Sequence, residues 1–195
     1  MLKTQSMLMD ELKAYANPKT KLSRLVKENV YFPIVRGLYE TSPHTAGYLL
    51  AGSIYGPSYL SFEFALSLYG LIPERVTTFT SATCLKKKKK FYDTPFGVFT
   101  YQDIPLAAYP YGILIREENE YAYRIASPEK ALCDQLYASP LIKNLSQLSD
   151  LLFNNLRIDE YELTQLNYSD LELYTSLYGS SNVKLLGELF RRRRI

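Results

Sequence analysis

The sequence predicts an α+β fold: an N-terminal winged-helix-like module, a mixed β-sheet domain flanked by helices, and a helical C-terminal tail. Apolar residues recur at helical spacing near both ends, whereas the middle holds short β-branched and aromatic runs bounded by turn residues. With 195 residues, 47% of them hydrophobic, the chain is long enough to bury a core. We expect the module at residues 1–42, an α/β domain at 43–140, and a helical extension at 141–195 packed on it.

The first 42 residues predict two helices followed by a hairpin. Helical spacing of apolar residues runs from Thr4 to Ala16, and Asn17-Pro18 ends that helix and begins a second one. The run from Val30 to Tyr39 is β-branched and aromatic and predicts two short strands that turn near Arg36-Gly37. A winged helix usually has three helices before its wing, so this module is predicted to be trimmed.

The middle of the chain alternates helices and strands. An apolar helix is expected at Ala46 to Tyr55, and a second helix is expected to be capped by Ser58 or Ser61 and to end at Gly70. Five short strands follow, at Val76 to Ser81, Phe91-Tyr92, Gly97 to Tyr101, Ile113 to Arg116 and Tyr121 to Ile125.

Helices dominate the remainder. We expect them at Pro128 to Tyr137, Leu145 to Leu156, Glu160 to Leu166, Asp170 to Tyr178 and Val183 to Arg193. One face of the fourth carries Leu171, Tyr174, Leu177 and Tyr178. Because an apolar stripe at this spacing normally faces the interior, core packing is favoured there over a docking surface.

No catalytic constellation is apparent in the sequence. The single histidine, His44, lies in a linker without an orienting carboxylate, and the two cysteines, Cys84 and Cys133, follow no metal or redox spacing. We therefore expect no catalytic residue, no metal site and no cofactor, and free thiols in a reducing cytoplasm. No apolar stretch reaches the roughly 20 residues of a membrane helix, so neither membrane insertion nor export is expected.

A metal-dependent nuclease remains a less favoured alternative. It would recruit Glu63, Asp93 and Glu129-Lys130 as its paired acids and lysine. Glu63 and Glu129 are explained more simply as first-turn residues, where a negative side chain complements the helix dipole.

Positive charge is concentrated in a few places. The predicted second helix carries Lys19, Lys21, Arg24 and Lys27, and Arg36 lies at the predicted wing. A basic helix followed by a basic, glycine-containing hairpin is how a winged helix grips DNA and its flanking phosphates, so these five residues are the DNA-binding candidates. Taken alone, the helix would equally suit a solvated amphipathic face.

Two basic runs lie outside the module. The candidate phosphate contacts are Lys86, Lys87, Lys88, Lys89, Lys90, Arg191 and Arg192, and the second run continues to Arg194. The lysine run is otherwise explained as a solvated, mobile surface loop, because like charges repel one another. The arginine run is otherwise explained by cations stabilising the last turn of a helix.

Several short motifs occur in an order and spacing that resemble the AbiEi family of bacterial antitoxins and transcriptional regulators. They are Arg36-Gly37-Leu38-Tyr39, Tyr59-Leu60-Ser61, Ala65-Leu66, Tyr69-Gly70-Leu71-Ile72-Pro73, Phe96-Gly97 and residues 126–134, which read ASPEKALCD. The resemblance covers roughly residues 1–140 and includes a winged helix followed by an α/β domain.

The resemblance implies an antitoxin of a type IV toxin–antitoxin, or abortive-infection, system that represses its own operon. Its implied partners are operator DNA of its own promoter and, functionally, a nucleotidyltransferase toxin that need not be contacted directly. The alternative is a protein-interaction module that does not bind DNA and holds a partner through the α/β domain or the acidic helical tail.

Overall fold

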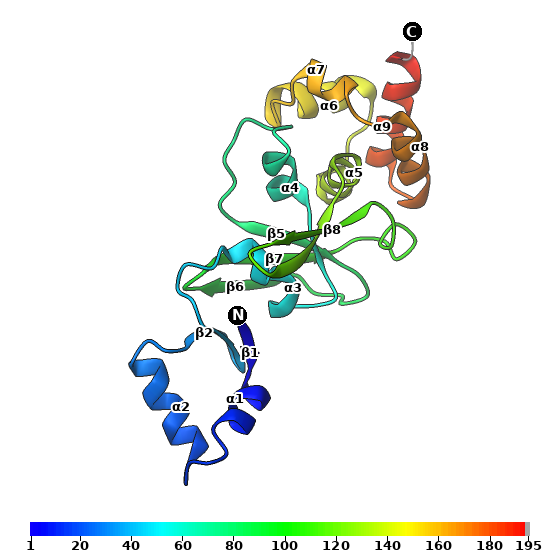
Figure 1. Ribbon diagram of the computed structural model, residues 1–195. Helices are drawn as coiled ribbons and strands as arrows, with labels where there is room; N and C mark the ends of the chain where they lie inside the picture. The colour runs from blue at the N-terminus through cyan, green and yellow to red at the C-terminus, as the bar shows by residue number, and fades with distance from the viewer. Residues whose placement is uncertain (194–195) are drawn as a thin grey trace.

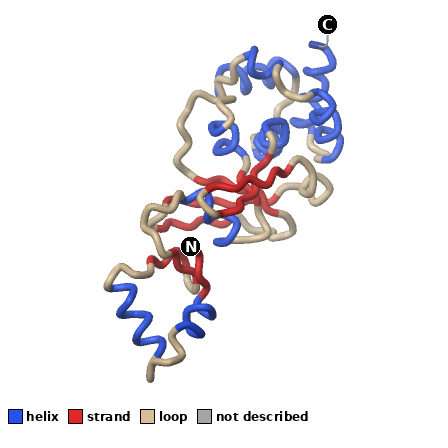
Figure 2. Tube along the Cα trace, viewed as in Figure 1, coloured by secondary structure: helices blue, strands red, loops and turns tan. Residues whose placement is uncertain are grey.

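The computed structural model describes residues 1–193, with the side chains of residues up to 192, as two units joined by a short linker. A small N-terminal unit lies at one end, and a larger unit with a sheet and many helices continues to the C-terminus (Figure 1). Strands gather in the middle of the molecule and helices at both ends (Figure 2). The predicted α+β class, the mixed sheet and the helical C-terminal part are confirmed.

The N-terminal unit has the element order β1-α1-α2-β2-β3. Its bounds are β1 Leu2–Thr4, α1 Gln5–Glu11, α2 Pro18–Lys27, β2 Phe32–Val35 and β3 Leu38–Glu40. The antiparallel sheet has the order β1-β3-β2, with the β2–β3 hairpin as the wing. Leu8, Leu12 and Leu22 form a small core under the two helices. The unit therefore resembles a winged helix from its first strand to its wing.

The first predicted helix is wrong at both ends. Its first residue, Thr4, instead ends β1 and caps α1, because the Thr4 hydroxyl oxygen accepts the Met7 N–H at 3.3 Å. The helix stops at Glu11 rather than Ala16. A three-residue strand carries too little alternation to be recognised from sequence, and it forms because β3 offers it a partner.

The larger unit is built on a six-stranded mixed sheet. Its strands are β4 Tyr59–Leu60, β5 Phe79–Thr83, β6 Lys90–Thr94, β7 Gly97–Asp103, β8 Ile113–Glu118 and β9 Tyr121–Ala126. The order is β6-β7-β5-β4-β9-β8, in which β4–β9 and β5–β7 are parallel and the other neighbours antiparallel. Of the two caps expected for the next helix, Ser61 precedes it, although its side chain makes no capping bond, and Tyr59-Leu60 before it is a central strand that the sequence did not predict.

Helices cover both faces of this sheet. The 3₁₀ helix η1 Gly47–Leu50 and α3 Ala51–Ile54 lie on one face, and α4 Phe62–Leu68 and α5 Pro128–Ala138 lie on the other (Figure 1). The C-terminal helices follow as α6 Leu145–Ser149, α7 Glu160–Thr164, α8 Tyr168–Leu177 and α9 Ser181–Arg193. Between α6 and α7 the segment Asp150–Asn155, labelled η2, is a π-helix rather than the continuous α-helix expected.

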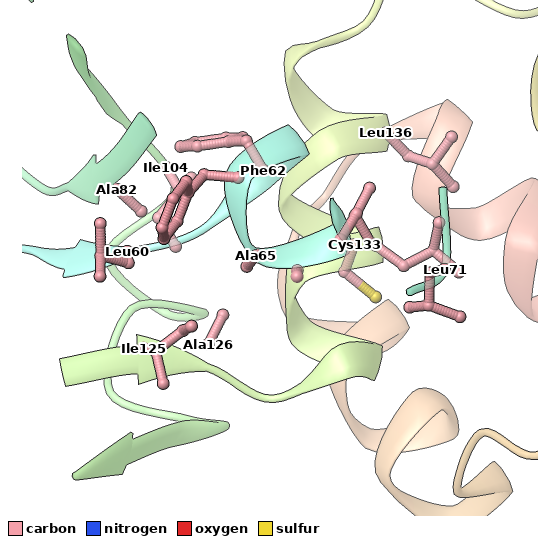
Figure 3. Close-up of a cluster of buried hydrophobic side chains, with 14 of the residues drawn as sticks. Leu60, Phe62, Ala65, Leu71, Ala82, Ile104, Ile125, Ala126, Cys133 and Leu136 are labelled. Atoms are coloured by element: carbon pink, nitrogen blue, oxygen red, sulfur yellow. The ribbon is translucent and has the colours of Figure 1, made fainter. Parts of the chain in front are cut away.

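The main core lies between the sheet and the helices α4 and α5. Side chains of neighbouring strands, among them Leu60, Ala82 and Ile125, meet Ala65 of α4 and Cys133 of α5 (Figure 3). Cys133 is fully buried and Cys84 half-buried, and both are free thiols.

The C-terminal helices extend this core. The helix α5 packs against both α8 and α9, and Leu171, Tyr174, Tyr178 and Val183 are buried in the core. The prediction that the apolar face of α8 is core rather than a docking surface is thus confirmed. Among the helices of the described chain, none is both long and apolar enough to cross a bilayer.

Gly47 is required by close packing. A Cβ atom there would lie 2.2 Å from the Phe96 carbonyl oxygen and 2.3 Å from the Phe79 ring. We expect Gly47→Ala to lower the free energy of unfolding by about 1–3 kcal/mol, because backbone or ring must move to admit the methyl group. Urea denaturation measures this. Gly52→Ala, where nothing lies within 4 Å, is the matched control and should be neutral or slightly stabilising; equal effects of the two substitutions would contradict the explanation.

Candidate nucleic-acid interface

The helix α2 is fixed by caps at its start and by apolar contacts along one side. Pro18 occupies its first turn, and the Asn17 side-chain oxygen accepts the Thr20 N–H at 3.1 Å. Leu22 is buried, and Leu25 and Val26 pack beside it. The opposite side of α2 therefore faces solvent, and α1 and α2 are successive helices joined by a short turn.

Two of the four predicted cations of α2 are held by neighbouring side chains. The Arg24 Nε donates to Glu28 Oε1 at 2.7 Å. The Lys21 Nζ lies 5.0 Å from the centroid of the Tyr15 ring. Lys19 and Lys27 are exposed, and within residues 1–192 neither forms an ion pair. Lys19 and Lys27 are thus the cations of α2 that are least constrained.

Lys19 and Lys27 border the same groove. It has a volume of about 400 Å³ and runs between α2 and the strands β2 and β3, and Ser23, Pro33 and Gln5 also line it. Lysines at positions 19 and 27 are two turns apart on one side of α2 and thus flank Ser23. The groove presents two ammonium groups and a hydroxyl group at the surface of the module.

Arg36 lies at the wing turn, outside the lining of this groove. It is exposed and precedes Gly37, whose φ of 83° is one that L side chains rarely adopt. The Gly37 carbonyl accepts the Gln5 N–H at 2.8 Å, which ties the wing turn to the start of α1. Since Gln5 also lines the groove, the wing turn contacts one residue of the groove lining.

The lysine run Lys86 to Lys90 belongs to the larger unit. The loop predicted for this run is shorter than five residues, because Lys90 is already the first residue of β6. Lys86 Nζ donates to the Gly56 carbonyl at 2.9 Å, and the Lys87 N–H donates to Asp103 Oδ2 at 2.6 Å. The mutual repulsion of five lysines predicts a mobile segment. In the structure its first two residues are held by the Gly56 carbonyl and the Asp103 carboxylate. Lys88 and Lys89 remain exposed.

The arginine run is remote from the module. Arg191 and Arg192 are exposed on α9, at the opposite end of the molecule from α2 (Figure 1). Arg194 lies outside the described residues. The structure therefore places Lys19 and Lys27 on one groove, leaves Arg36 at the wing turn outside the lining of that groove, and places neither basic run beside them.

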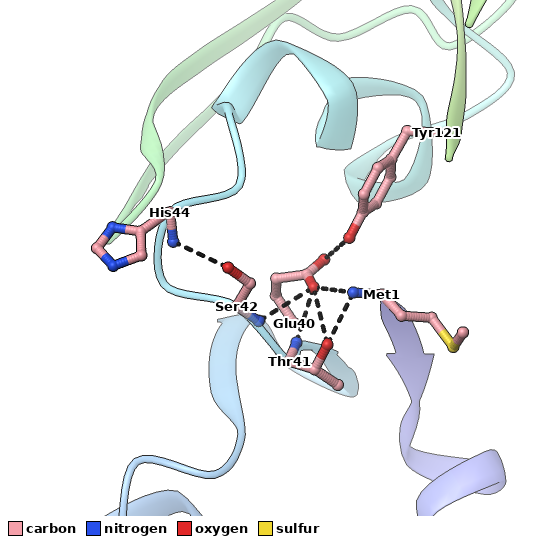
Figure 4. A network of polar contacts seen from close by, with 6 residues as sticks. All are labelled: Met1, Glu40, Thr41, Ser42, His44 and Tyr121. Atoms are coloured by element: carbon pink, nitrogen blue, oxygen red, sulfur yellow. Dashed lines mark hydrogen bonds and ion pairs between the residues drawn. The ribbon is translucent and has the colours of Figure 1, made fainter. Parts of the chain in front are cut away.

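A buried glutamate joins the two units. The Glu40 carboxylate accepts the Tyr121 hydroxyl at 2.7 Å and the Thr41 N–H at 2.8 Å, and it pairs with the terminal ammonium of Met1 (Figure 4). Burial alone would raise the pKa of Glu40, but these donors hold its pKa below the usual range. His44 contributes to this network through its backbone, whose N–H donates to the Ser42 hydroxyl (Figure 4).

We expect the joint to weaken in acid. Because the folded-state pKa of Glu40 is below its ordinary 4.5, its contribution is present above that pH and is lost as the pH falls through the lower, folded-state value. Glu40→Gln should cost about 1.5–3 kcal/mol near neutral pH and remove this part of the acid sensitivity. Chemical denaturation of both proteins across the acid range measures it. Tyr121→Phe is the milder control, and an unchanged acid profile in Glu40→Gln would contradict the assignment.

A second polar cluster is completely buried in the larger unit. The Asp134 carboxylate accepts hydrogen bonds from Tyr59 at 3.0 Å, Ser61 at 2.6 Å, Tyr178 at 2.5 Å and the Lys130 ammonium at 2.8 Å. Burial lowers the pKa of Lys130, which Asp134 opposes, and burial raises the pKa of both tyrosines. The hydroxyl groups stay protonated and donate, so this cluster ties β4, α5 and the end of α8 together.

The three acids of the nuclease alternative are not brought together. The Glu129 carboxylate accepts the Asn167 N–H at 2.8 Å, Glu63 lies next to Gln135, and Asp93 is exposed on β6. Within the described part of the chain, no three His, Cys, Asp or Glu side chains gather as a metal site would require.

Comparison with known proteins adds no relative: no family model matches the chain, and no curated protein matches it.

Proposed function

We propose that the chain is a DNA-binding autorepressor that acts as the antitoxin of a type IV toxin–antitoxin pair. The observation that carries the DNA-binding part is the groove of the N-terminal unit, which is lined by Lys19 and Lys27, two exposed lysines without an ion pair among the described residues. A cation that is already in an ion pair adds little binding free energy when it meets a phosphate. A lysine without an ion pair releases counterions from the DNA when it binds.

The mechanism begins at the helices α1 and α2. The helix α2 enters the major groove, Lys19 and Lys27 contact phosphates along one side of the helix, and Arg36 on the wing contacts the flanking backbone. Occupation of the promoter in this way blocks transcription. The buried joint at Glu40 holds the module against the larger unit, so the DNA-bound protein presents its second unit in a fixed direction.

The antitoxin part rests on the family resemblance of residues 1–140. A nucleotidyltransferase gene beside this one is the expected genetic setting. Its product expressed alone should arrest growth, and co-expression of this chain should restore growth.

The test of DNA binding is the affinity of the full chain for a duplex that contains its own promoter. Fluorescence anisotropy should show tighter binding to that duplex than to an unrelated duplex of equal length. Equal binding to both, or binding only to the product of the neighbouring gene, would favour the protein-interaction module instead.

A further inference from the structure

The larger unit has an aromatic side chain exposed on its sheet. Phe91 on the edge strand β6 is 65% exposed. It pairs with Thr100 of the neighbouring strand β7. The helix α4 packs on β5 and leaves this outer part of the sheet open. A phenylalanine on an open sheet face is a typical platform for a flat aromatic ring.

Phe91 belongs to the wall of a groove of about 500 Å³. The groove lies between the start of α4, the end of α5 and the strands β5, β7 and β6, and its lining includes Phe62, Gln102, Gln135 and Lys89. This volume is in the range of small-molecule sites, and apolar rings with a few amide and ammonium groups are the usual lining of such sites.

The two ends of the groove differ in charge. Lys89 and Lys90 directly precede Phe91 and line one end, and both are exposed. At the helical end Gln135 Nε2 donates to Glu63 Oε1 at 3.4 Å. An occupant that is anionic at one end, aromatic in the middle and neutral but hydrogen-bonding at the other end would match this pattern.

Phe62 on the groove wall has an unusual backbone. Its φ of 56° is in the left-handed region, which is rare for a bulky residue. The conformation is held by neighbours: Ser61 N–H donates to the Thr80 carbonyl at 2.9 Å, and Phe64 N–H donates to the Thr80 hydroxyl at 3.2 Å. Strain of this kind is retained where surrounding contacts fix it, and it shapes this wall of the groove.

We infer that this groove binds a nucleotide unit, either as a free nucleotide or as a residue of a single strand. The base stacks on Phe91 with its hydrogen-bonding edge toward Glu63 and Gln135, and the phosphate, which the sugar links to the base, lies at Lys89. This assigns a role to the end of the lysine run that the DNA-binding module does not use. The site is separate from the duplex-binding groove and does not depend on it.

The test uses the full chain with Lys19→Glu and Lys27→Glu already introduced, so that the N-terminal unit does not capture the probe. Two probes are titrated: adenosine 5′-monophosphate by calorimetry, and a fluorescein-labelled single-stranded oligonucleotide by anisotropy. We expect Phe91→Ala to weaken binding roughly 10-fold, because it removes the stacking surface. Lys89→Glu should weaken binding and reduce its salt dependence.

Two matched controls separate this site from general effects. Ile115→Ala removes another exposed apolar side chain from the opposite edge strand, and Lys184→Glu makes the same charge change on α9. Both should bind as the parent does. Binding of the mononucleotide supports the inference with a free nucleotide as ligand, and binding of the oligonucleotide alone supports it with a single strand.

Three results would overturn the inference. They are no binding of either probe, binding that Phe91→Ala leaves unchanged, or equally tight binding of an acidic peptide that Phe91→Ala does not affect. Because Phe91 is exposed, its replacement should leave the fold intact, which a thermal denaturation scan verifies. Failure of this test leaves duplex binding by wild-type chain intact, so the two proposals fail independently.

Discussion

Replacing Asp134 with alanine is expected to lower the free energy of unfolding by about 3–5 kcal/mol. The carboxylate is fully buried and accepts from four donors, so its loss removes the counter-ion of Lys130, which keeps only its bond to the Tyr178 hydroxyl, and leaves three hydroxyl groups without their acceptor. The side chain of Lys130 is itself completely buried, with its Nζ 4.6 Å from the centroid of the Tyr178 ring. Urea denaturation followed by circular dichroism measures the loss.

Two further variants separate charge from hydrogen bonding. Lys130→Met should be milder, because Asp134 keeps the hydroxyl donors of Tyr59, Ser61 and Tyr178. Asp134→Asn keeps an acceptor oxygen without the charge and should fall between wild type and Asp134→Ala. A double-mutant cycle with Lys130→Met gives the coupling energy of the pair. A loss below about 0.5 kcal/mol in Asp134→Ala would mean that the cluster does not stabilise the fold.

Much of the larger unit is visible in the sequence because its signals are local. The sequence predicts a helix over Pro128 to Tyr137, and the structure has α5 there, with the Ser127 hydroxyl oxygen accepting the Lys130 N–H at 3.2 Å as its cap. The strands β8 and β9 are predicted from short β-branched and aromatic runs bounded by turn residues. The strand β4 was missed, because two residues carry no period and Tyr59-Leu60 becomes a strand only through pairing with β5 and β9.

The candidate site was predictable in part. The basic side of α2 and the wing at Arg36 followed from spacing alone. The ion pair of Arg24 with Glu28 was missed, although its spacing of four residues was a usable signal. The contact of Glu40 with Tyr121 joins residues 81 apart in the chain, and the groove beside Phe91 joins elements from three regions, so neither was foreseeable from local sequence.

Reversing Lys19 and Lys27 together is expected to weaken binding to the promoter duplex by roughly 30-fold or more at physiological salt. These side chains are exposed on α2, make no ion pair within the described residues, and flank one groove, so their reversal replaces two phosphate contacts with repulsion. The change should not affect folding. Equilibrium binding by anisotropy measures the affinity.

The other cations of the module provide a graded comparison. Arg24→Ala should have a smaller effect, because Arg24 is already paired with Glu28, and Arg36→Glu should act in the same direction as the lysine reversals. Lys184→Glu on α9 is the matched charge control and should bind as wild type. If the Lys19→Glu/Lys27→Glu protein and these three single variants all lost the same affinity, net charge rather than the α2 groove would account for binding.

The salt dependence of promoter binding tests the central claim most directly. For the wild-type chain, the logarithm of the binding constant should fall linearly with the logarithm of the salt concentration, and the Lys19→Glu/Lys27→Glu protein should show a slope smaller by about 2. A wild-type affinity that does not change with salt, or the same slope in both proteins, would contradict phosphate contact by α2.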